Sequence, residues 1–388
     1  MSDDDTTPAG APRPFSIFGG GPFLALARRC HLVRASGLLD VGWLVGLAWG
    51  PIGLAALFRL AGHQPVDPID LDISVHARLL VEMPLLVAAG QMLDGQCRAA
   101  VHQLYLGRLA DPEALDRILD RTEALAHARW VEAALFAGAF LLGQLVLWGV
   151  LGATGILTGT ARASMSFTRA WYSVIALPLV QFLAARWMWR WAVWTYFLAR
   201  LSRLPLAAEA THPDRAAGLG CLAWPLGGFN WFVLAFVSVL AGGWGTRLLE
   251  GTSTVRAFIP NALTIFFFAI TVGCAPLLLF SIHLYRAKRR DTAAYSLWNL
   301  DYVRRFRAKW IERAPGDPLG TEDVQSFDNT QNVFQMILTT RLLVFSPTKL
   351  KYTILAVLAP MLPLLLLEVP IERILERIGQ SALGVLPL

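Results

Sequence analysis

Residues 261–285 read NALTIFFFAITVGCAPLLLFSIHLY, an apolar run that ends where a basic stretch begins at Arg286. A helix needs about 20 mostly apolar residues to cross a bilayer, and this run is long enough. Of the 388 residues in the chain, 55% are hydrophobic and only 16% are charged. That composition is too apolar for a soluble domain of this length, so it indicates a polytopic membrane protein.

Further apolar runs of the same kind predict an all-α polytopic transmembrane helix bundle of about seven spans. Besides 261–285, the predicted spans cover residues 37–62, 77–95, 130–152, 171–201, 218–244 and 352–370. The predicted organisation is a cytoplasmic tail and pre-span helix (1–36), six spans (37–285) with a cytoplasmic helical hairpin (96–129), a cytoplasmic helical insertion (286–351), and a final span with a short tail (352–388).

The basic residues predict the orientation of these spans. Most of the 34 Lys and Arg residues lie on the side of the N-terminus when the predicted spans alternate in direction. Since cytoplasmic loops carry an excess of Lys and Arg, we expect a cytoplasmic N-terminus and an external C-terminus. The first residues, MSDDDTTPAGAPRPF, lack the basic region and apolar core of a signal peptide. The Gly-rich stretch FGGGPF (18–23) has no phosphate-loop context and is interpreted as a flexible turn.

The predicted insertion contains aromatic residues at spacings of three and four, which place them on one face of a helix. These residues are Tyr295, Trp298, Tyr302, Phe306 and Trp310. Because Arg and Lys residues flank the stripe, one interpretation is a helix that lies in the membrane interface. The other interpretation is that the stripe packs on the predicted helix at 110–130.

The fourth span contains the stretch RWMWR, in which Arg186 and Arg190 lie four residues apart and so share one helix face. Charged residues inside a bilayer cost at least about 2.5–3.5 kcal/mol each, and they usually face the bundle interior and pair. Depths calculated from a helical rise of about 1.5 Å per residue match Arg186 with Glu82 of the second span. We therefore expect an Arg186–Glu82 pair, with Arg190 reaching toward Asp40 or Asp94.

Such a pair has two interpretations: an ion pair that fixes helix register, or an anion site or polar transport path. Other polar residues within the spans are predicted to form hydrogen bonds between helices. They are Gln91, Gln144, Gln181, Asn230 and His283.

The sequence THPDRAAGLG, which begins at Thr211, is the sharpest short motif in the chain. One interpretation is a binding cluster of His212, Asp214 and Arg215 at the inner end of the fifth span. The other is a helix start, with Thr211 or His212 as the cap and Pro213 in the first turn. A helix N-terminus there would favour an anion such as a lipid phosphate.

Three stretches together resemble a family of uncharacterised bacterial polytopic inner-membrane proteins. They are the Arg-rich fourth span with its His-Pro-Asp-Arg loop (186–222), DVQSFDNTQNVFQMI (323–337) and LAPMLPLLLLEVPIERIL (358–375). The resemblance implies a multi-pass protein of the bacterial inner membrane with a helical architecture, and it implies no activity.

The sequence contains no HExxH, GxSxG, Walker A or dinucleotide-binding pattern, and its four cysteines show no metal-ligand spacing. We therefore predict no catalytic residue, metal or cofactor. The leading interpretation is a non-enzymatic membrane protein whose cytoplasmic face binds lipid headgroups or a protein partner, and not nucleic acid. The alternative is a transporter or channel whose path is lined by Arg186, Arg190 and Glu82. A third interpretation is a membrane-embedded enzyme around His212 and Asp214.

Overall fold

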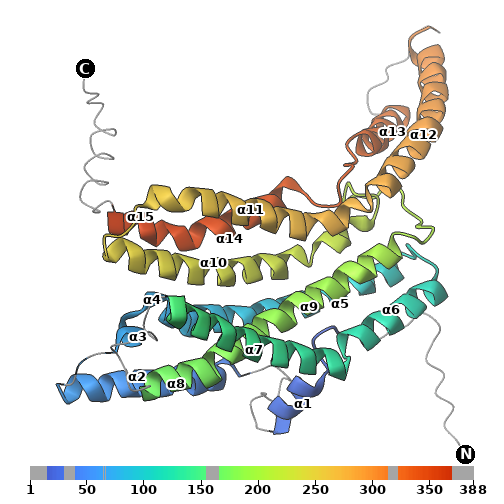
Figure 1. The fold of residues 1–388 in the computed structure, drawn as a ribbon. Coiled ribbons are helices and arrows are strands. Elements are labelled where there is room, and N and C mark those ends of the chain that lie inside the picture. The colour runs from blue at the N-terminus through green and yellow to red at the C-terminus, as the bar shows by residue number, and fades with distance from the viewer. Residues whose placement is uncertain are drawn as a thin grey trace, which may run out of the picture.

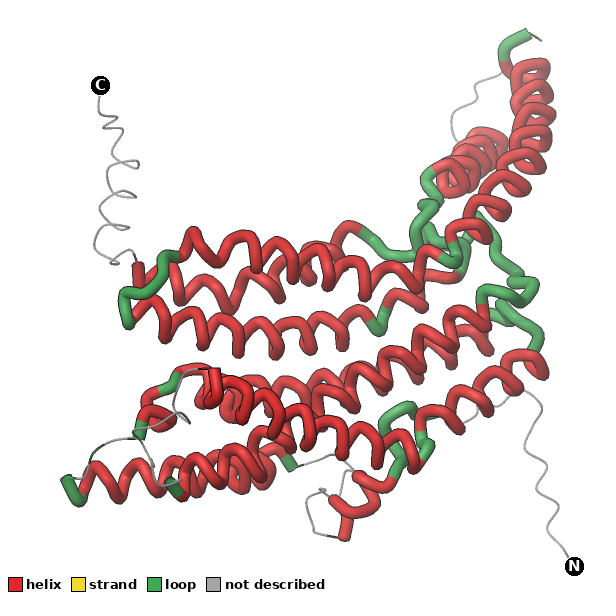
Figure 2. Tube along the Cα trace, in the orientation of Figure 1, coloured by secondary structure: helices red, strands yellow, loops and turns green. Residues whose placement is uncertain are grey.

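The computed structural model describes residues 15–29, 40–63, 65, 67–153, 166–312 and 322–368. All regular elements among these residues are helices (Figures 1 and 2). Seven helical segments are long and apolar enough to cross a membrane. The predicted all-α bundle of about seven spans is confirmed, and the chain is a multi-pass membrane protein.

The seven segments follow the predicted spans, with several of them longer than predicted. They are Val41–Ala61, Ile73–Leu106, Pro112–Gln144, Phe167–Leu201, Leu219–Leu249, Val255–Leu278 and Pro347–Leu367. The helices are α1 (Pro22–Arg29), α2 (Val41–Ala61), α3 (Pro68–Leu71), α4 (Ile73–Ala77), η1 (Arg78–Glu82), α5 (Met83–Leu106), α6 (Pro112–Ala126), α7 (Arg129–Ala153), α8 (Phe167–Trp171), η2 (Tyr172–Ala176), α9 (Leu177–Leu201), η3 (Leu219–Ala223), α10 (Leu226–Leu249), α11 (Val255–Leu278), α12 (Ser281–Trp310), α13 (Glu322–Leu338), α14 (Pro347–Leu358), η4 (Ala359–Met361) and α15 (Leu362–Glu368).

The spans form two groups that meet at α10. Helices α10, α11, α14 and α15 lie together, and α5, α7 and α9 lie on the other side of α10 with α2 and α8 beyond them (Figure 1). Glycines let α10 approach α5 closely, because a Cβ at Gly228 would lie only 2.8 Å from the Cβ of Leu93. Small residues at such contacts are the usual way for membrane helices to pack tightly.

The two ends of the bundle differ. Helix α12 leaves one end and is followed by α13, which packs against it to form a hairpin that projects from the bundle (Figure 1). We call the α12–α13 hairpin the arm, and the end of the bundle from which it projects the arm end. The arm end also carries residues 107–111, 202–225 and 339–346. At the opposite end, Arg59 of α2 forms an ion pair with Asp70 and donates to the hydroxyl of Thr168 at 2.6 Å. These bonds fasten the ends of α2, α3 and α8 together.

Helix α6 explains why α5 and α9 are longer than a membrane requires. The helix predicted at 110–130 begins at Pro112, and the Asp111 side chain caps it by accepting from the backbone N–H of Ala114 at 2.9 Å. Charged residues cover its outer face, while Leu115 and Leu119 are buried in its contact with α9. A helix this polar does not suit the hydrocarbon region. The last turns of α9 therefore run beside α6 beyond the membrane boundary.

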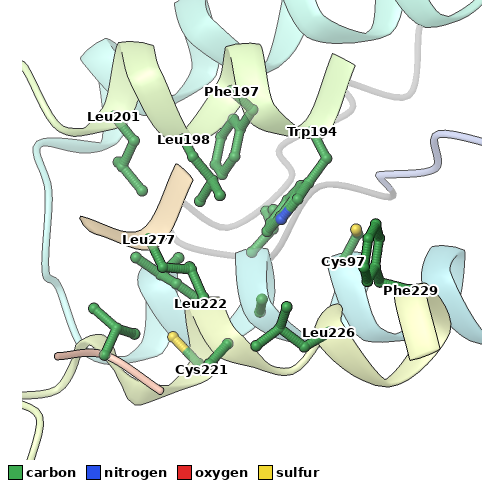
Figure 3. Packing of buried hydrophobic residues seen from close by; sticks show 14 of the residues in the cluster. Cys97, Trp194, Phe197, Leu198, Leu201, Cys221, Leu222, Leu226, Phe229 and Leu277 are labelled. Carbon is green, nitrogen blue, oxygen red and sulfur yellow. The ribbon is translucent and has the colours of Figure 1, made fainter. Parts of the chain in front are cut away.

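Apolar packing at the arm end joins the two groups of helices. Trp194 and Phe197 of α9 face Leu222, Leu226 and Leu277 from the other group (Figure 3). Their side chains are buried, so this cluster forms the core that fixes the segment between α9 and α10.

The aromatic stripe of α12 packs on α13. The ring centroids of Phe306 and Phe327 lie 4.7 Å apart, and those of Tyr302 and Phe327 lie 6.4 Å apart. The interpretation that the stripe packs on the helix at 110–130 is therefore wrong. The sequence analysis considered the membrane interface and the helix at 110–130 as partners of the stripe. It did not consider α13, the next helix in the chain.

Candidate functional sites

The two arginines of the fourth span share one carboxylate. Oε1 of Glu132 accepts from Nε of Arg186 at 2.9 Å and from Nη2 of Arg190 at 2.8 Å. Glu132 lies in the first turn of α7, which packs along α9. The side chains of Arg186, Arg190 and Glu132 are 5%, 0% and 3% exposed. One buried negative charge therefore faces two buried positive charges.

The predicted Arg186–Glu82 pair is wrong. Glu82 instead faces Arg78, one turn earlier on the same span, with 3.8 Å between Oε2 of Glu82 and Nε of Arg78. The depth of Arg186 was calculated from Arg200 as the membrane boundary. Because α9 continues beside α6 beyond that boundary, Arg186 lies closer to the arm end, level with the start of α7.

The predicted partners of Arg190 also have other roles. Asp40 caps α2 and accepts from the backbone N–H of Gly42 at 2.9 Å. Asp94 forms an ion pair with Arg98 at 2.8 Å. The predicted transport path requires Glu82 to lie beside Arg186 and Arg190. The structure does not bring these three residues together.

The segment Phe15–Arg29 covers this charged cluster. Oε2 of Glu132 accepts from the backbone N–H of Phe23 at 2.9 Å, and Nη2 of Arg186 donates to the carbonyl of Gly20 at 3.3 Å. The ring of Phe18 lies 5.5 Å from Cζ of Arg186 and 5.9 Å from Cζ of Arg190, within cation–π range.

Asp94 of α5 holds the first part of this segment. Its Oδ1 accepts from the backbone N–H of Ile17 at 2.7 Å, from that of Phe18 at 3.0 Å and from the hydroxyl of Ser16 at 2.8 Å. Phe15 and Ile17 are buried against the bundle. The chain bends through FGGGPF, in line with the predicted turn, and charged side chains of the bundle bind the backbone of this segment.

The motif after Thr211 forms a tight loop around Asp214. Oδ1 of Asp214 accepts from the backbone N–H groups of Ala216 at 2.8 Å and Gly218 at 3.1 Å, and Oδ2 accepts from that of Gly220 at 2.9 Å. Burial alone would raise the pKa of Asp214. The three backbone donors and His212 outweigh burial, so this pKa lies below its ordinary value.

The predicted helix start at Thr211 or His212 is wrong. Residues 211–218 form turns, η3 begins at Leu219 and α10 only at Leu226. Arg215 has a φ of 55° and Gly218 a φ of 86°, so the chain turns back on itself here. The loop closes around a carboxylate because Asp214 satisfies three N–H groups that a helix would have bonded internally.

A pocket of about 320 Å³ lies beside this loop. Much of its wall is apolar, and we call it the polar pocket because charged side chains line it. His212 and Asp214 line it together with Arg341 and Lys349, which come from the segment that leads into α14 and from its first turn. Nη2 of Arg341 donates to the carbonyl of Asp214 at 2.9 Å, while its buried Nε has no hydrogen-bond partner. Arg215, which was predicted to join the cluster, contributes its backbone carbonyl to the N–H of Arg341 at 2.8 Å.

The pocket lining does not favour acid–base chemistry. Nδ1 of His212 lies 3.0 Å from Oδ1 of Asp214. Among the described residues, Asp214 is the only carboxylate in the lining, and backbone N–H groups already hold it. In the part of the chain that the structure describes, the lining therefore holds one His–Asp pair and no second carboxylate.

An apolar groove of about 440 Å³ runs next to the polar pocket, between α5, α10 and α14. Met92, Trp231 and Leu355 line it, and they are 38%, 40% and 58% exposed. Lys349 lines both the groove and the polar pocket.

Sequence reasoning missed Glu132, Arg341 and Lys349. Glu132 stands at the edge of the predicted third span, and the charged helix before it was a signal that α9 continues beyond the membrane. Lys349 precedes the predicted last span, and the structure places it in the first turn of α14, after Ser346 and Pro347. Nothing in the sequence connects Arg341 with Asp214 across more than a hundred residues.

Comparison with known protein families, with characterised proteins and with solved structures found no match to this chain.

Proposed function

We propose that this protein binds an anionic phospholipid at the arm end, with the phosphate headgroup in the polar pocket and an acyl chain in the apolar groove. The single observation that carries this proposal is the position of Lys349, which lines both cavities. A cation between a polar pocket and an apolar groove suits the boundary between the head and the tail of a lipid.

Charge in the pocket favours an anionic headgroup. Arg341 and Lys349 supply two cations, and Nε of Arg341 is without a hydrogen-bond partner. The carboxylate of Asp214 already accepts three backbone N–H bonds, so those donors offset much of its charge. Arg and Lys are the usual phosphate ligands in proteins.

The groove favours a chain supplied by the bilayer. Its walls are mainly apolar, and the exposed side chains of Met92, Trp231 and Leu355 lie on helices that span the membrane. An acyl chain buried there gains the same packing that it has among other lipids, while the headgroup gains two cationic partners.

The proposed orientation places the arm end in the cytoplasm of a bacterial cell, with the protein in the inner membrane. The excess of Lys and Arg at this end and the resemblance described above support that orientation. A cytoplasmic protein partner that docks on the arm is the remaining part of the sequence prediction, and it stays a prediction.

The experiment is lipid retention measured by native mass spectrometry. The protein is reconstituted with equal amounts of phosphatidylglycerol and phosphatidylcholine, then purified in mild detergent. We expect the wild type to retain phosphatidylglycerol selectively. Arg341→Gln and Lys349→Gln are each expected to lower this selectivity about tenfold, because each removes a charge-assisted contact.

Lys351→Gln is the matched control, because Lys351 is an exposed residue of the same helix that does not line either cavity. Circular dichroism shows whether each variant folds. Equal retention of the two lipids by the wild type, or unchanged selectivity in both pocket variants, would overturn the proposal.

A further inference from the structure

A second cavity, of about 460 Å³, lies inside the bundle between η1, α7, α9 and α10. Its walls are apolar except for Arg78, Glu82 and Gln181. Glu82 follows Ile73, the first residue of its span, by nine residues, which is about 14 Å along the helix. The polar groups of this cavity therefore lie near the middle of the membrane, far from the phospholipid site proposed above.

Two residues of the cavity lining each carry a hydrogen-bond acceptor that no donor satisfies. Oε2 of Glu82 and Oε1 of Gln181 are both buried and have no hydrogen-bond partner. The distance of 3.8 Å from Oε2 of Glu82 to Nε of Arg78 is too long for a hydrogen bond. Glu82 as a whole is only 7% exposed.

Other polar residues of the spans do form hydrogen bonds between helices, as the sequence predicted. Gln144 donates to the carbonyl of Ser173 at 2.7 Å, and Oδ1 of Asn230 accepts from the hydroxyl of Thr353 at 2.8 Å, although Nδ2 of Asn230 is buried without a partner. Buried polar groups almost always find partners, and those that do not call for an explanation such as a missing ligand. Glu82 and Gln181 therefore stand out because each carries an unsatisfied acceptor and both residues line the same cavity.

Two of the helical segments beside the cavity contain a π-helical turn in place of a regular α-helical turn. The π-helical turn η1 ends at Glu82, and a second π-helical turn, η2, lies just before α9, which carries Gln181. Such turns are rare and occur frequently at functional sites. Nη1 of Arg78 in η1 donates to the hydroxyl of Tyr172 in η2. This hydrogen bond joins the two turns and directs one end of the guanidinium toward Tyr172 and not toward Glu82.

The cavity is bordered by α7 and α10, both of which present side chains to the bilayer. Leu142 of α7 is 59% exposed and Phe236 of α10 is 46% exposed, and both line the cavity. A Cβ added at Gly138 would meet no atom within 4 Å, so space remains beside the backbone of α7. Access from the bilayer means that the ligand is soluble in lipid.

We propose that this cavity binds a lipophilic ligand whose polar head is a hydrogen-bond donor, a hydroxyl or an ammonium group, which donates to Glu82 and Gln181. Two acceptors select a hydrogen-bond donor, while Arg78, which also lines the cavity, balances the charge of the Glu82 carboxylate. The apolar walls hold the rest of the molecule. This cavity selects a hydrogen-bond donor, whereas the phospholipid site takes an anionic acceptor, so the two proposals stand or fall separately.

The test is photolabelling of the full-length protein in lipid nanodiscs. The probes are a long-chain alcohol, the corresponding primary amine, the methyl ether and the carboxylic acid, each with a diazirine on the chain. We expect the alcohol, the amine or both to label peptides of α7 and α10 around Leu142 and Phe236. The ether and the ionised acid both lack a hydrogen-bond donor, and they are expected to label about tenfold less.

Variants place the labelling in the cavity. Glu82→Leu and Gln181→Leu are each expected to lower the labelling about tenfold, while Gln91→Leu, at another polar position of α5, leaves it unchanged. Gly138→Leu fills the open space without removing a polar group, so it blocks labelling even if Glu82→Leu fails to fold. Equal labelling by the ether, or wild-type labelling of Gly138→Leu, would overturn the proposal. Labelling by only one of the two donors identifies the head as a hydroxyl or as an ammonium group.

Discussion

Nε of Arg186 donates to Oε1 of Glu132 at 2.9 Å, and this ion pair joins α9 to the first turn of α7 deep inside the protein. The same oxygen accepts from Arg190, so a single carboxylate balances two guanidinium groups. Burial makes each of these charges expensive to leave alone. The stability of the α7–α9 contact therefore depends on Glu132 more than on either arginine.

Within the described part of the chain, Glu132 is the only carboxylate that contacts the two arginines directly, and replacing it with Gln removes that charge. Removal of one partner from a buried ion pair typically costs about 3–5 kcal/mol, because it leaves an unpaired charge. We expect Glu132→Gln to lower the melting temperature in detergent strongly or to abolish folding.

The matched control is Glu82→Gln. Its carboxylate makes no hydrogen bond through Oε2, and the nearest cation lies 3.8 Å away, so we expect a small change in melting temperature. The double variant Arg186→Gln/Glu132→Gln should lose less stability than the sum of its single variants, because the two residues contact one another. A larger loss for Glu82→Gln than for Glu132→Gln would contradict this account.

The segment that covers the cluster depends on a glycine. Gly21 has a φ of 102°, and a Cβ there would lie 2.4 Å from Oε1 of Glu132. We expect Gly21→Ala to detach the segment, which trypsin would then cut at Arg28 and Arg29 faster than in the wild type. Gly46→Ala is the control, because a Cβ at Gly46 meets no atom within 4 Å. Equal cleavage of the two variants would show that the segment does not need Gly21.

The sequence was sufficient to predict the spans because each one is a local property. Twenty apolar residues in a row cross a bilayer whatever surrounds them. The partner of Arg186 is not local. It depends on where the membrane boundary crosses α9, and that position becomes clear only once the polar helix α6 is seen to lie beside the last turns of α9.

The burial of Phe15 and Ile17 could not be predicted for a related reason. The apolar residues of this short stretch do not recur with the spacing of a helix or a strand. The stretch is held by a hydrogen bond from the backbone N–H of Ile17 to the carboxylate of Asp94. Backbone contacts leave no pattern of side chains in the sequence. By contrast, the importance of Asp214 was visible in the His-Pro-Asp-Arg motif, although its role as the centre of a loop required the structure.

The loop around Asp214 predicts a dependence of stability on pH. Its pKa is lowered in the folded protein, so the ionised carboxylate stabilises the fold at any pH above the ordinary value of about 3.9. This contribution is lost as the pH falls from that value through the lowered pKa. Asp214→Asn lacks the charge, and we expect it to be less stable than the wild type by about 1–3 kcal/mol at pH 7.

Melting temperatures of the two proteins between pH 7 and pH 3 check this prediction. The difference between wild type and Asp214→Asn should stay constant down to about pH 4 and shrink below it. A difference that is independent of pH would mean that the charge of Asp214 does not hold the loop.

The arm is expected to open independently of the bundle. Helix α13 packs mainly on α12, where Phe327 stacks on Phe306 and Trp310 donates to Asp323 at 3.0 Å. Phe327→Ala removes the stacking, and because Phe327 is only half-buried we expect a loss of about 1–2 kcal/mol, below the 3–5 kcal/mol of a fully buried Phe.

Hydrogen exchange in nanodiscs measures this loss where it occurs. In Phe327→Ala the amides of 322–338 should exchange about tenfold faster, while those of α5, α9 and α10 keep the rates of the wild type. Leu297→Ala is the control, because Leu297 is 71% exposed and its removal leaves the aromatic packing intact. Faster exchange throughout the bundle would instead mean that α12 transmits the state of the arm into the membrane helices through its continuity with α11.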